Sequence, residues 1–191
     1  MSIYFIRHAQ SKFNAAYQPG DPDPLIFDAP LSPHGQQQAI DTRKHIVDLD
    51  IDNIIVSPLT RTLQTATLIF ENAYPVSINA AIREQLSFSG DVGSPPHKLT
   101  QDYPHLDFDH LDEHWWYDGE NNQHGYAVEP HSSLQQRADQ FTAFLLANST
   151  RSTAIVTHGN FIHTTTGIQP ENCEIIKFDP INRTSQSVTH G

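Results

Sequence analysis

Residues 2–8 of the chain read SIYFIRH, a short apolar run that leads directly into an arginine and a histidine. The run is typical of a buried strand over 2–6, and strand-like and helix-like segments alternate after it. We expect further strands at 53–56, 76–78, 152–157 and 173–178, and helices at 35–49, from 57 to about 71, from 132 or 133 to 146, and at 161–166.

This alternation predicts an α/β fold with a mostly parallel sheet and helices on both faces. Ser57 and Pro58 are expected to start a helix, because serine is a good N-cap and proline suits the first helical position. The segment 87–130 interrupts the alternation of strands and helices with glycines, prolines and an acidic, aromatic stretch. It is too long for a simple loop between two elements. We therefore predict one domain over residues 1–191, with a lid-like excursion at about 87–130.

The composition argues against several classes of protein. With 191 residues, of which 37% are hydrophobic and 17% charged, the chain can form one globular core. Its net charge of −11 and its few lysines (Lys12, Lys44, Lys98 and Lys177) make nucleic acid and anionic lipid poor partners. One cysteine, Cys173, fits a reducing compartment, and we find neither a signal-peptide pattern nor a membrane-spanning run. We expect a soluble cytoplasmic protein, and the sequence does not determine its oligomeric state.

Reactive side chains follow four of the predicted strands. In open α/β sheets, ligands bind outside the carboxyl ends of the strands, so residues that are far apart in the chain should converge there. The set consists of Arg7 and His8, Ser57 with Arg61 one helical turn later, Arg83 and Glu84, and His158 and Gly159.

Such a set suits phosphoryl transfer without a metal. Arginine forks match phosphate oxygens, and two of them with a histidine can neutralise a dianion and its transition state. A neutral imidazole is a competent nucleophile towards phosphorus near pH 7. Glu84 can protonate a departing alkoxide if its pKa is raised, and backbone N–H groups at His158 and Gly159 can bind the anion. From the residues alone an anion-binding site follows, whereas the reaction stays open.

The same residues resemble the motifs of the histidine phosphatase superfamily, which also contains the cofactor-dependent phosphoglycerate mutases. Five motifs occur in the family's order and extend to about residue 165, and together they are highly specific. They are Arg7-His8-Ala9-Gln10-Ser11-Lys12-Phe13-Asn14, the stretch from Leu31 to Ala39, the stretch from Ser57 to Ala66, Glu84, and His158-Gly159.

The resemblance implies a three-layer α/β/α sandwich with a mostly parallel central sheet. It implies that His8 is the nucleophile that becomes phosphorylated and that Glu84 is the proton donor, with no metal or cofactor. The other residues that we expect in the site are Arg7, Arg61 and His158 around the phosphate, and Ser11, Asn14, Ser57 and Gly159 as phosphate or substrate contacts.

Ala9 departs from the family, which usually has glycine after the nucleophile. Alanine does not easily adopt a positive φ, so a site that required one would misdirect His8. We expect a negative φ at Ala9, a backbone carbonyl that orients the imidazole, and an active enzyme.

The activity that we expect is hydrolysis of phosphate monoesters, on small phosphorylated metabolites, through a phosphohistidine. Three alternatives stay open: a phosphoglycerate mutase-type phosphotransferase, a protein phosphatase acting on phosphohistidine or phosphotyrosine, and a phosphoanion-binding regulator without catalysis. The family's mutases are generally longer, with extra basic contacts and a closing tail. This chain is poor in lysine and has a polar tail over 182–191, which favours the phosphatase.

Three features of the sequence carry weaker claims. His110 and His114 have the spacing of a zinc pair on a helix, although a solvated acidic surface is the more ordinary interpretation. Of Trp115 and Trp116, one is expected to anchor the excursion and the other to line the pocket mouth. His97, Lys98 and Lys12 are candidate contacts for a second anionic group, with surface charge as the alternative.

Overall fold

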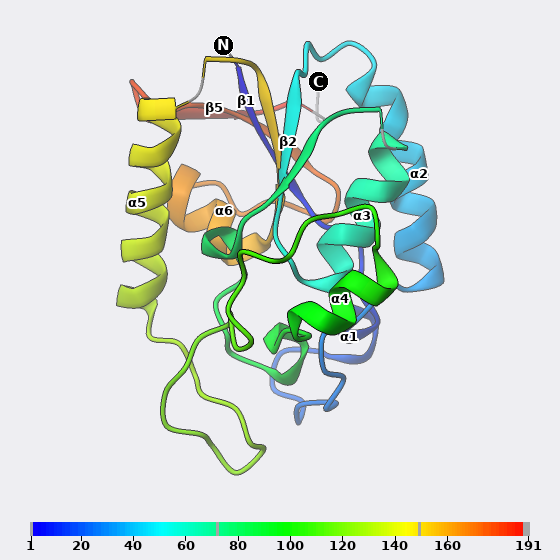
Figure 1. Ribbon diagram of the computed structural model, residues 1–191, viewed down its shortest axis with the longest axis vertical. Coiled ribbons are helices and arrows are strands. Elements are labelled where there is room, and N and C mark those ends of the chain that lie inside the picture. Colours follow the sequence, from blue (N-terminus) through cyan, green and yellow to red (C-terminus); the bar gives the residue numbers. More distant parts are fainter. Residues whose placement is uncertain (1, 72, 149, 189–191) are drawn as a thin grey trace.

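The computed structural model describes residues 2–71, 73–148 and 150–188, and within them a six-stranded sheet forms the centre (Figure 1). The strand order is β3-β2-β4-β1-β5-β6. The first four strands in this order run parallel, and β5 and β6 are antiparallel to their neighbours. The predicted mostly parallel sheet is confirmed. Its strands are β1 (Ile3–Arg7), β2 (Asn53–Val56), β3 (Val76–Ile78), β4 (Thr153–Thr157), β5 (Ile175–Asp179) and β6 (Thr184–Ser187).

Helices cover both faces of the sheet (Figure 1). Side chains alternate along a strand, so Tyr4 and Ile6 of β1 enter one core, and Ile3 and Phe5 enter the other. The first core is covered by α2 (Pro33–Ile46) and α3 (Thr60–Phe70), the second by α5 (His131–Asn148) and α6 (Gly159–Thr166). This is the predicted three-layer sandwich. The shorter helices are α1 (Lys12–Ala16), η1 (Ala80–Ile82), η2 (Ser89–Asp91) and α4 (Pro96–Asp102).

Strand register brings the ends of three strands to one edge of the sheet. Arg7 of β1 is paired with Thr157 of β4, and Val56 of β2 is paired with Val156 of β4. The next residues along these strands therefore emerge side by side. They are His8, His158 and Ser57.

The start of α3 differs from the prediction. The helix begins at Thr60, so Ser57 does not cap it. Asp28, from a loop 32 positions away, accepts hydrogen bonds from the Thr60 N–H at 2.8 Å and the Thr60 hydroxyl at 2.7 Å. Asp28 thus supplies the cap, and the Ser57 side chain is left for another contact.

The carboxyl-terminal segment also differs from the prediction. Cys173 does not start a strand: its φ is +62°, its N–H donates to the Arg7 carbonyl at 3.1 Å, and β5 begins two positions later, at Ile175. The Cys173 thiol is buried, and burial raises its pKa to about 11, which agrees with a packing role. The polar tail forms β6 along the edge of β5, a strand that we did not predict.

The segment 87–130 is anchored to the first core by Leu99, Phe108 and Trp115. Trp115 is buried in this core, which confirms the expected anchor, and its indole N–H donates to the Ser94 carbonyl of the same segment at 2.8 Å. Trp116 packs against the same core. Its expected place at the pocket mouth is wrong, because Trp116 packs on this core and does not line the cavity of the candidate site.

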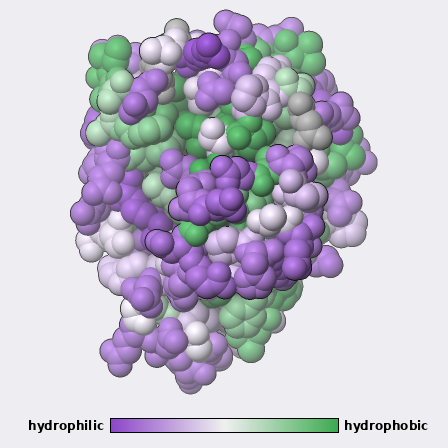
Figure 2. Space-filling model, in the orientation of Figure 1, coloured by the Kyte–Doolittle hydropathy of each residue, from purple (hydrophilic) through white to green (hydrophobic). Residues whose placement is uncertain are grey.

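Polar residues cover most of the molecular face that Figure 2 shows, in keeping with the net charge of −11. Among the described residues, no helix has the length and apolar character needed to cross a bilayer.

Candidate active site

A cavity of about 230 Å³ opens at the carboxyl end of β1. Most of the predicted site residues meet there, although they come from distant parts of the chain. Ser57 and His158 are fully buried and lie outside the described lining. The predicted residues that line the cavity are Arg7, His8, Ser11, Asn14, Arg61, Glu84 and Gly159.

Two hydrogen bonds define the tautomer of the His8 ring. Arg61 Nε donates to His8 Nε2 at 3.1 Å, so Nε2 carries a lone pair. Nδ1 therefore carries the proton, which it donates to the Ala9 carbonyl at 2.7 Å. Ala9 is not among the described non-glycine residues with a positive φ. As expected, alanine thus orients the ring without backbone strain.

The backbone around His8 is held by three separate elements. The His8 N–H donates to the Thr157 carbonyl of β4 at 2.9 Å. The Asn172 side chain donates to the His8 carbonyl at 2.8 Å, and the Ala9 N–H donates to the Thr65 hydroxyl of α3 at 3.1 Å. The position of the imidazole is therefore set before any ligand binds.

Burial, followed by the charges of Arg61 and Arg7, lowers the pKa of His8 well below its ordinary value. The ring is therefore neutral at pH 7 and its Nε2 lone pair can react with an electrophile. Burial and then Arg61 also lower the pKa of His158. Both imidazoles of the site are thus uncharged near neutral pH.

His158 lies beside His8, with ring centroids 5.2 Å apart. Its Nε2 is 2.8 Å from the Ser57 hydroxyl oxygen, and its buried Nδ1 has no hydrogen-bond partner among the described residues. The structure therefore brings the two imidazoles together. Ser57, which we expected to contact the substrate, is instead placed behind the cavity wall, where it contacts the second imidazole.

Arg61 is held in place by three hydrogen bonds. Besides its bond to His8, Nη1 donates to the Gly90 carbonyl at 2.5 Å and Nη2 donates to Asp91 Oδ1 at 2.8 Å. A guanidinium carries five N–H donors, so two of them remain for a ligand. The contact with Asp91 is an ion pair with little exposure on either side.

One nitrogen of the Arg7 guanidinium group is hydrogen-bonded to the protein, and another is not. Its Nη1 donates to the Pro170 carbonyl at 2.8 Å, while its buried Nε has no hydrogen-bond partner among the described residues. Gly159 starts α6 close by: a Cβ at that position would lie 3.4 Å from Arg7 Nε and 3.2 Å from Gln169 Nε2. A buried, unpaired N–H in a cavity wall is costly unless a ligand accepts from it.

Glu84 approaches the cavity from the loop after η1. Its two carboxyl oxygens accept from the Gln85 N–H at 2.8 Å and the Asn160 N–H at 3.2 Å. Burial, and then the neighbouring charge of Asp91, raises the pKa of Glu84 to about 7. A large fraction of this carboxyl group is therefore protonated at neutral pH, as proton donation requires.

Ser11 and Asn14 line the cavity and also cap α1. The Asn14 N–H donates to the Ser11 hydroxyl at 3.0 Å, while Asn14 Oδ1 accepts from the Ser11 N–H at 3.1 Å and from its hydroxyl at 3.0 Å. This reciprocal pairing is a capping box. It gives both side chains a structural role in addition to their place in the cavity wall.

Several lining residues were missed by the sequence analysis. Asp91 is one, because an aspartate in a long acidic segment carries no signal that it will pair with an arginine of α3. The other missed residues that line the cavity are Phe13, Tyr17, Ser87, Phe88, Gly90, Asn160 and Gln169. The available hints were the position of Phe13 within the motif over 7–14 and that of Asn160 directly after Gly159.

Other charged residues that we considered lie away from the cavity lining. Arg83, grouped above with Glu84, lies 3.6 Å from Glu129 and donates to the Ala80 carbonyl. His97 lies 3.3 Å from the exposed Glu113. Lys12 and Lys98 are also outside the lining, so the interpretation as surface charge holds for them.

His110 and His114 do not face a common point. His110 Nε2 lies 3.0 Å from the Ile78 carbonyl oxygen, and the His114 ring lies 4.1 Å from the Trp116 ring. In the part of the chain that the structure describes, no three histidine, cysteine, aspartate or glutamate side chains are placed to hold a metal ion.

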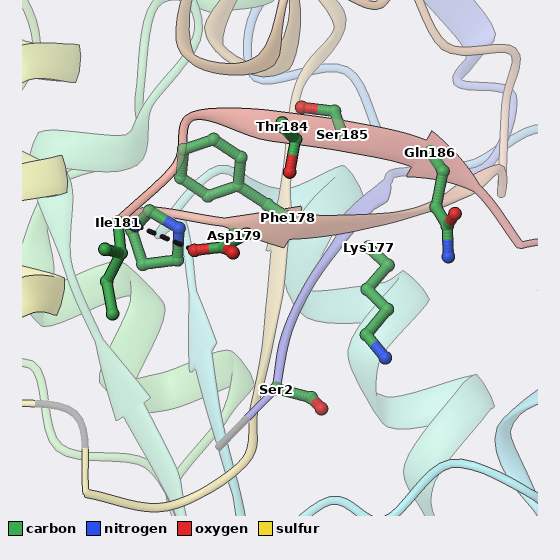
Figure 3. Close-up of a pocket in the computed structure, with 9 residues that line it drawn as sticks. Ser2, Lys177, Phe178, Asp179, Ile181, Thr184, Ser185 and Gln186 are labelled. Atoms are coloured by element: carbon green, nitrogen blue, oxygen red, sulfur yellow. Dashed lines mark hydrogen bonds between the residues drawn. The ribbon is translucent and has the colours of Figure 1, made fainter.

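A larger hollow, of about 560 Å³, lies at the opposite end of the sheet along β5 and β6 (Figure 3). Its lining includes Ser2, which precedes β1, and the charged residues Lys177 and Asp179. The Asp179 carboxylate accepts from the Ile181 N–H at 2.9 Å, within its own turn. This hollow lacks the convergent reactive groups of the smaller cavity, so we place the candidate active site in the smaller one.

Comparison with known proteins gives one family match over nearly the whole chain. The family model described as the histidine phosphatase superfamily (branch 1) matches residues 3–188. A curated phosphoglycerate mutase-like protein from Arabidopsis thaliana is 26% identical over 207 residues, which cover 85% of this chain and 72% of the relative.

Solved structures share the fold. The putative α-ribazole-5′-P phosphatase from Escherichia coli superposes with a TM-score of 0.61 and 18% identity, covering 98% of this chain and 94% of that chain. Phosphoserine phosphatase from Entamoeba histolytica, in complex with 3-phosphoglyceric acid, gives a TM-score of 0.61 and 20% identity, covering 97% and 94%. The sandwich architecture is therefore shared with known phosphatases.

Proposed function

Because this chain belongs to the histidine phosphatase superfamily, we propose that it is a phosphatase that hydrolyses phosphate monoesters through a phosphohistidine on His8. The observation that carries the proposal is the neutral His8 ring, whose Nε2 lone pair faces Arg61 Nε at 3.1 Å in a cavity shared with Arg7 and Glu84. A nucleophile, two cations and a proton donor in one cavity are the parts that the reaction needs.

In the proposed first step, His8 Nε2 attacks phosphorus and the bond from phosphorus to the ester oxygen breaks. Arg61 Nε, which contacts the lone pair in the resting site, then donates to a phosphoryl oxygen instead. The unpaired Nε–H of Arg7 and the spare donors of Arg61 bind the other oxygens. The Ala9 carbonyl stabilises the positive charge that develops on the ring, because it accepts from Nδ1.

Glu84 supplies the proton in this step. Its carboxyl group gives a proton to the leaving alkoxide, which departs as a neutral alcohol. In the second step, the Glu84 carboxylate removes a proton from water, the water oxygen attacks phosphorus, and the bond from phosphorus to His8 breaks. Inorganic phosphate leaves, and both His8 and Glu84 return to their starting states.

Small phosphorylated metabolites are the proposed substrates. A cavity of about 230 Å³ suits a small ester better than a folded phosphoprotein. Fold neighbours support this proposal, since they include proteins described as a putative α-ribazole-5′-P phosphatase, a phosphoserine phosphatase and a mycobacterial glucosyl-3-phosphoglycerate phosphatase.

The test is turnover combined with trapping of the phosphoenzyme. We expect wild-type protein to release phosphate from p-nitrophenyl phosphate and to carry an acid-labile, base-stable label on His8 after rapid mixing with radiolabelled ester. His8→Ala should lose the label and at least about 10³-fold in turnover, and His45→Ala, at an exposed position on α2, should lose neither. A label on another residue, or full activity of His8→Ala, would overturn the proposal.

The same preparation distinguishes hydrolysis from phosphate exchange. With 3-phosphoglycerate and 2,3-bisphosphoglycerate, we expect little 2-phosphoglycerate, whereas p-nitrophenyl phosphate should release free phosphate. Rapid formation of 2-phosphoglycerate without free phosphate would identify a mutase instead.

A further inference from the structure

Beyond the phosphate end, three aromatic side chains form one wall of the cavity. These side chains are Phe13, Tyr17 and Phe88. Their ring centroids are 5.3 Å apart for Phe13 and Tyr17, 5.6 Å for Phe13 and Phe88, and 4.8 Å for Tyr17 and Phe88. Phe13 is buried, whereas Tyr17 and Phe88 are partly exposed. The three rings therefore present a continuous apolar surface to any group attached to the phosphate.

The charges of the cavity lie at its phosphate end. Among the described lining residues the permanent cations are Arg7 and Arg61, and the acids are Glu84 and Asp91. Arg61 already pairs with Asp91, so little positive charge is left once a phosphoryl group is bound. A second phosphate or a carboxylate on the substrate would lose its hydration here without gaining a cation.

The Phe88 part of the aromatic wall is tied to the phosphate end through one carboxylate. Asp91 Oδ1 pairs with Arg61, and Asp91 Oδ2 accepts from the Ser87 and Phe88 N–H groups at 3.2 Å each. Asp23 also holds this segment, because its carboxylate accepts from the Ser89 N–H at 2.8 Å and the Ser89 hydroxyl at 2.6 Å. The distance between wall and phosphate is thus set in the free protein, which favours a ligand that reaches both.

From these observations we propose that the substrate is a phosphomonoester of a neutral alcohol that carries a planar, apolar-faced ring, and that the ring packs on Phe13, Tyr17 and Phe88. This inference rests on the proposed phosphatase activity. Neutral polar side chains of Ser87, Asn160 and Gln169 also line the cavity and can bond hydroxyl groups of such an alcohol. Substrates with a second anionic group are selected against.

The experiment compares three primary alkyl phosphates that differ only in their far end: 2-phenylethyl phosphate, butyl phosphate and 3-carboxypropyl phosphate. In wild-type protein we expect kcat/KM for the phenyl ester to exceed that for the butyl ester by at least about tenfold, the effect of one aromatic packing contact. The carboxylate-bearing ester should fall below the butyl ester by a similar factor. Equal values for the three, or a preference for the carboxylate, would overturn the inference.

Variants of the wall test the assignment of residues. Phe88→Leu should reduce the phenyl-to-butyl ratio at least about threefold, whereas Phe144→Leu, at an exposed position on α5, should leave the ratio unchanged. Tyr17→Lys should raise kcat/KM for the carboxylate-bearing ester relative to butyl phosphate. Unchanged ratios in both wall variants would place the alcohol elsewhere and overturn the assignment.

The three-ester panel also separates this inference from the proposed function. Absence of turnover and of phosphoenzyme with these three esters and with p-nitrophenyl phosphate would overturn the phosphatase proposal and, with it, this inference. Turnover of all three esters without a ring preference would overturn this inference alone.

Discussion

Replacing Arg137 of α5 by alanine is expected to destabilise the fold by about 3–5 kcal/mol, because it leaves a buried carboxylate without its main partner. Arg137 Nε and Nη2 donate to the two carboxyl oxygens of Glu129 at 2.9 and 2.8 Å, and the Glu129 side chain is 0% exposed. Three carbonyls also lose a donor: Arg137 Nη1 bonds those of Ala81 at 2.7 Å and Arg83 at 3.1 Å, and Nη2 bonds that of Glu84 at 3.4 Å.

The magnitude follows from what compensates the loss and what does not. The Ser133 hydroxyl still donates to Glu129 at 2.8 Å, and the Arg83 guanidinium lies 3.6 Å away, so the carboxylate keeps some stabilisation. The orphaned carbonyls would raise the loss above this range, by about 1–3 kcal/mol each, only where water cannot reach them. A loss of this size is a large share of the 5–15 kcal/mol that usually separates folded from unfolded protein.

The pH dependence of the unfolding free energy provides a second test of the same change. Burial acts to raise the pKa of Glu129, but the bonds and charge of Arg137, with Ser133 and Arg83, lower it below its ordinary value. A depressed carboxyl pKa gives stability that is present above about pH 4.5 and is lost as the pH falls further. In Arg137→Ala the pKa should rise instead, so the stability gap to wild type should narrow as the pH is lowered from 7 to about 4.5.

Urea denaturation followed by tryptophan fluorescence measures both effects. Arg151→Ala, at an exposed position, is the matched control and should change the unfolding free energy by less than about 0.5 kcal/mol. A loss below about 1 kcal/mol in Arg137→Ala, or a gap that stays constant with pH, would refute the reasoning. Adding Glu129→Gln to Arg137→Ala should cost less than the two single losses combined, because no unpaired charge is then buried.

Three further changes test the site and its support. Glu84→Gln should lower kcat for alkyl phosphates by about 10²–10³-fold and for activated aryl phosphates far less, and equal losses on both ester types would remove Glu84 from the acid role. In the wild-type protein, kcat/KM for alkyl esters should fall as the pH rises through about 7, because Glu84 loses its proton there. Gly35→Ala should destabilise by about 2 kcal/mol or more in urea titrations, since the new Cβ would lie 2.0 Å from the Gln10 carbonyl oxygen; a neutral effect would contradict this packing. Trp115→Phe should cost about 1 kcal/mol in thermal unfolding through loss of its bond to the Ser94 carbonyl, and an unchanged Tm would show that this bond contributes nothing to stability.

Local patterns in the chain were enough to predict five of the six strands and the main residues of the cavity. Strands at 53–56 and 76–78 were predicted with the observed bounds, because short apolar runs between breaks are local features. Placing His8 and Arg61 at one site needed only the rule that parallel strands deliver their following residues to a common edge. The family motifs added the proposed roles of these residues.

Contacts between distant loops were decided by the tertiary structure alone. Asp91 reaches Arg61 across 30 positions, and Asp28 caps α3 across 32. Nothing in the local sequence marks either aspartate, because an acidic side chain in a polar segment looks the same whether it is solvated or paired. The helix start expected at Ser57 failed for the same reason: the actual cap comes from a loop that only folding brings near.

The aromatic wall shows the same division between local and long-range information. Phe13 belongs to a recognisable motif near the amino terminus, but Phe88 lies in a segment without periodicity. Their rings meet at 5.6 Å only because Asp91 and Asp23 hold that segment against the sheet edge. Hydrophobic period and chain breaks determine which elements form, whereas the docking of irregular segments depends on hydrogen bonds between residues far apart in the chain, and this docking shapes the space around the phosphate.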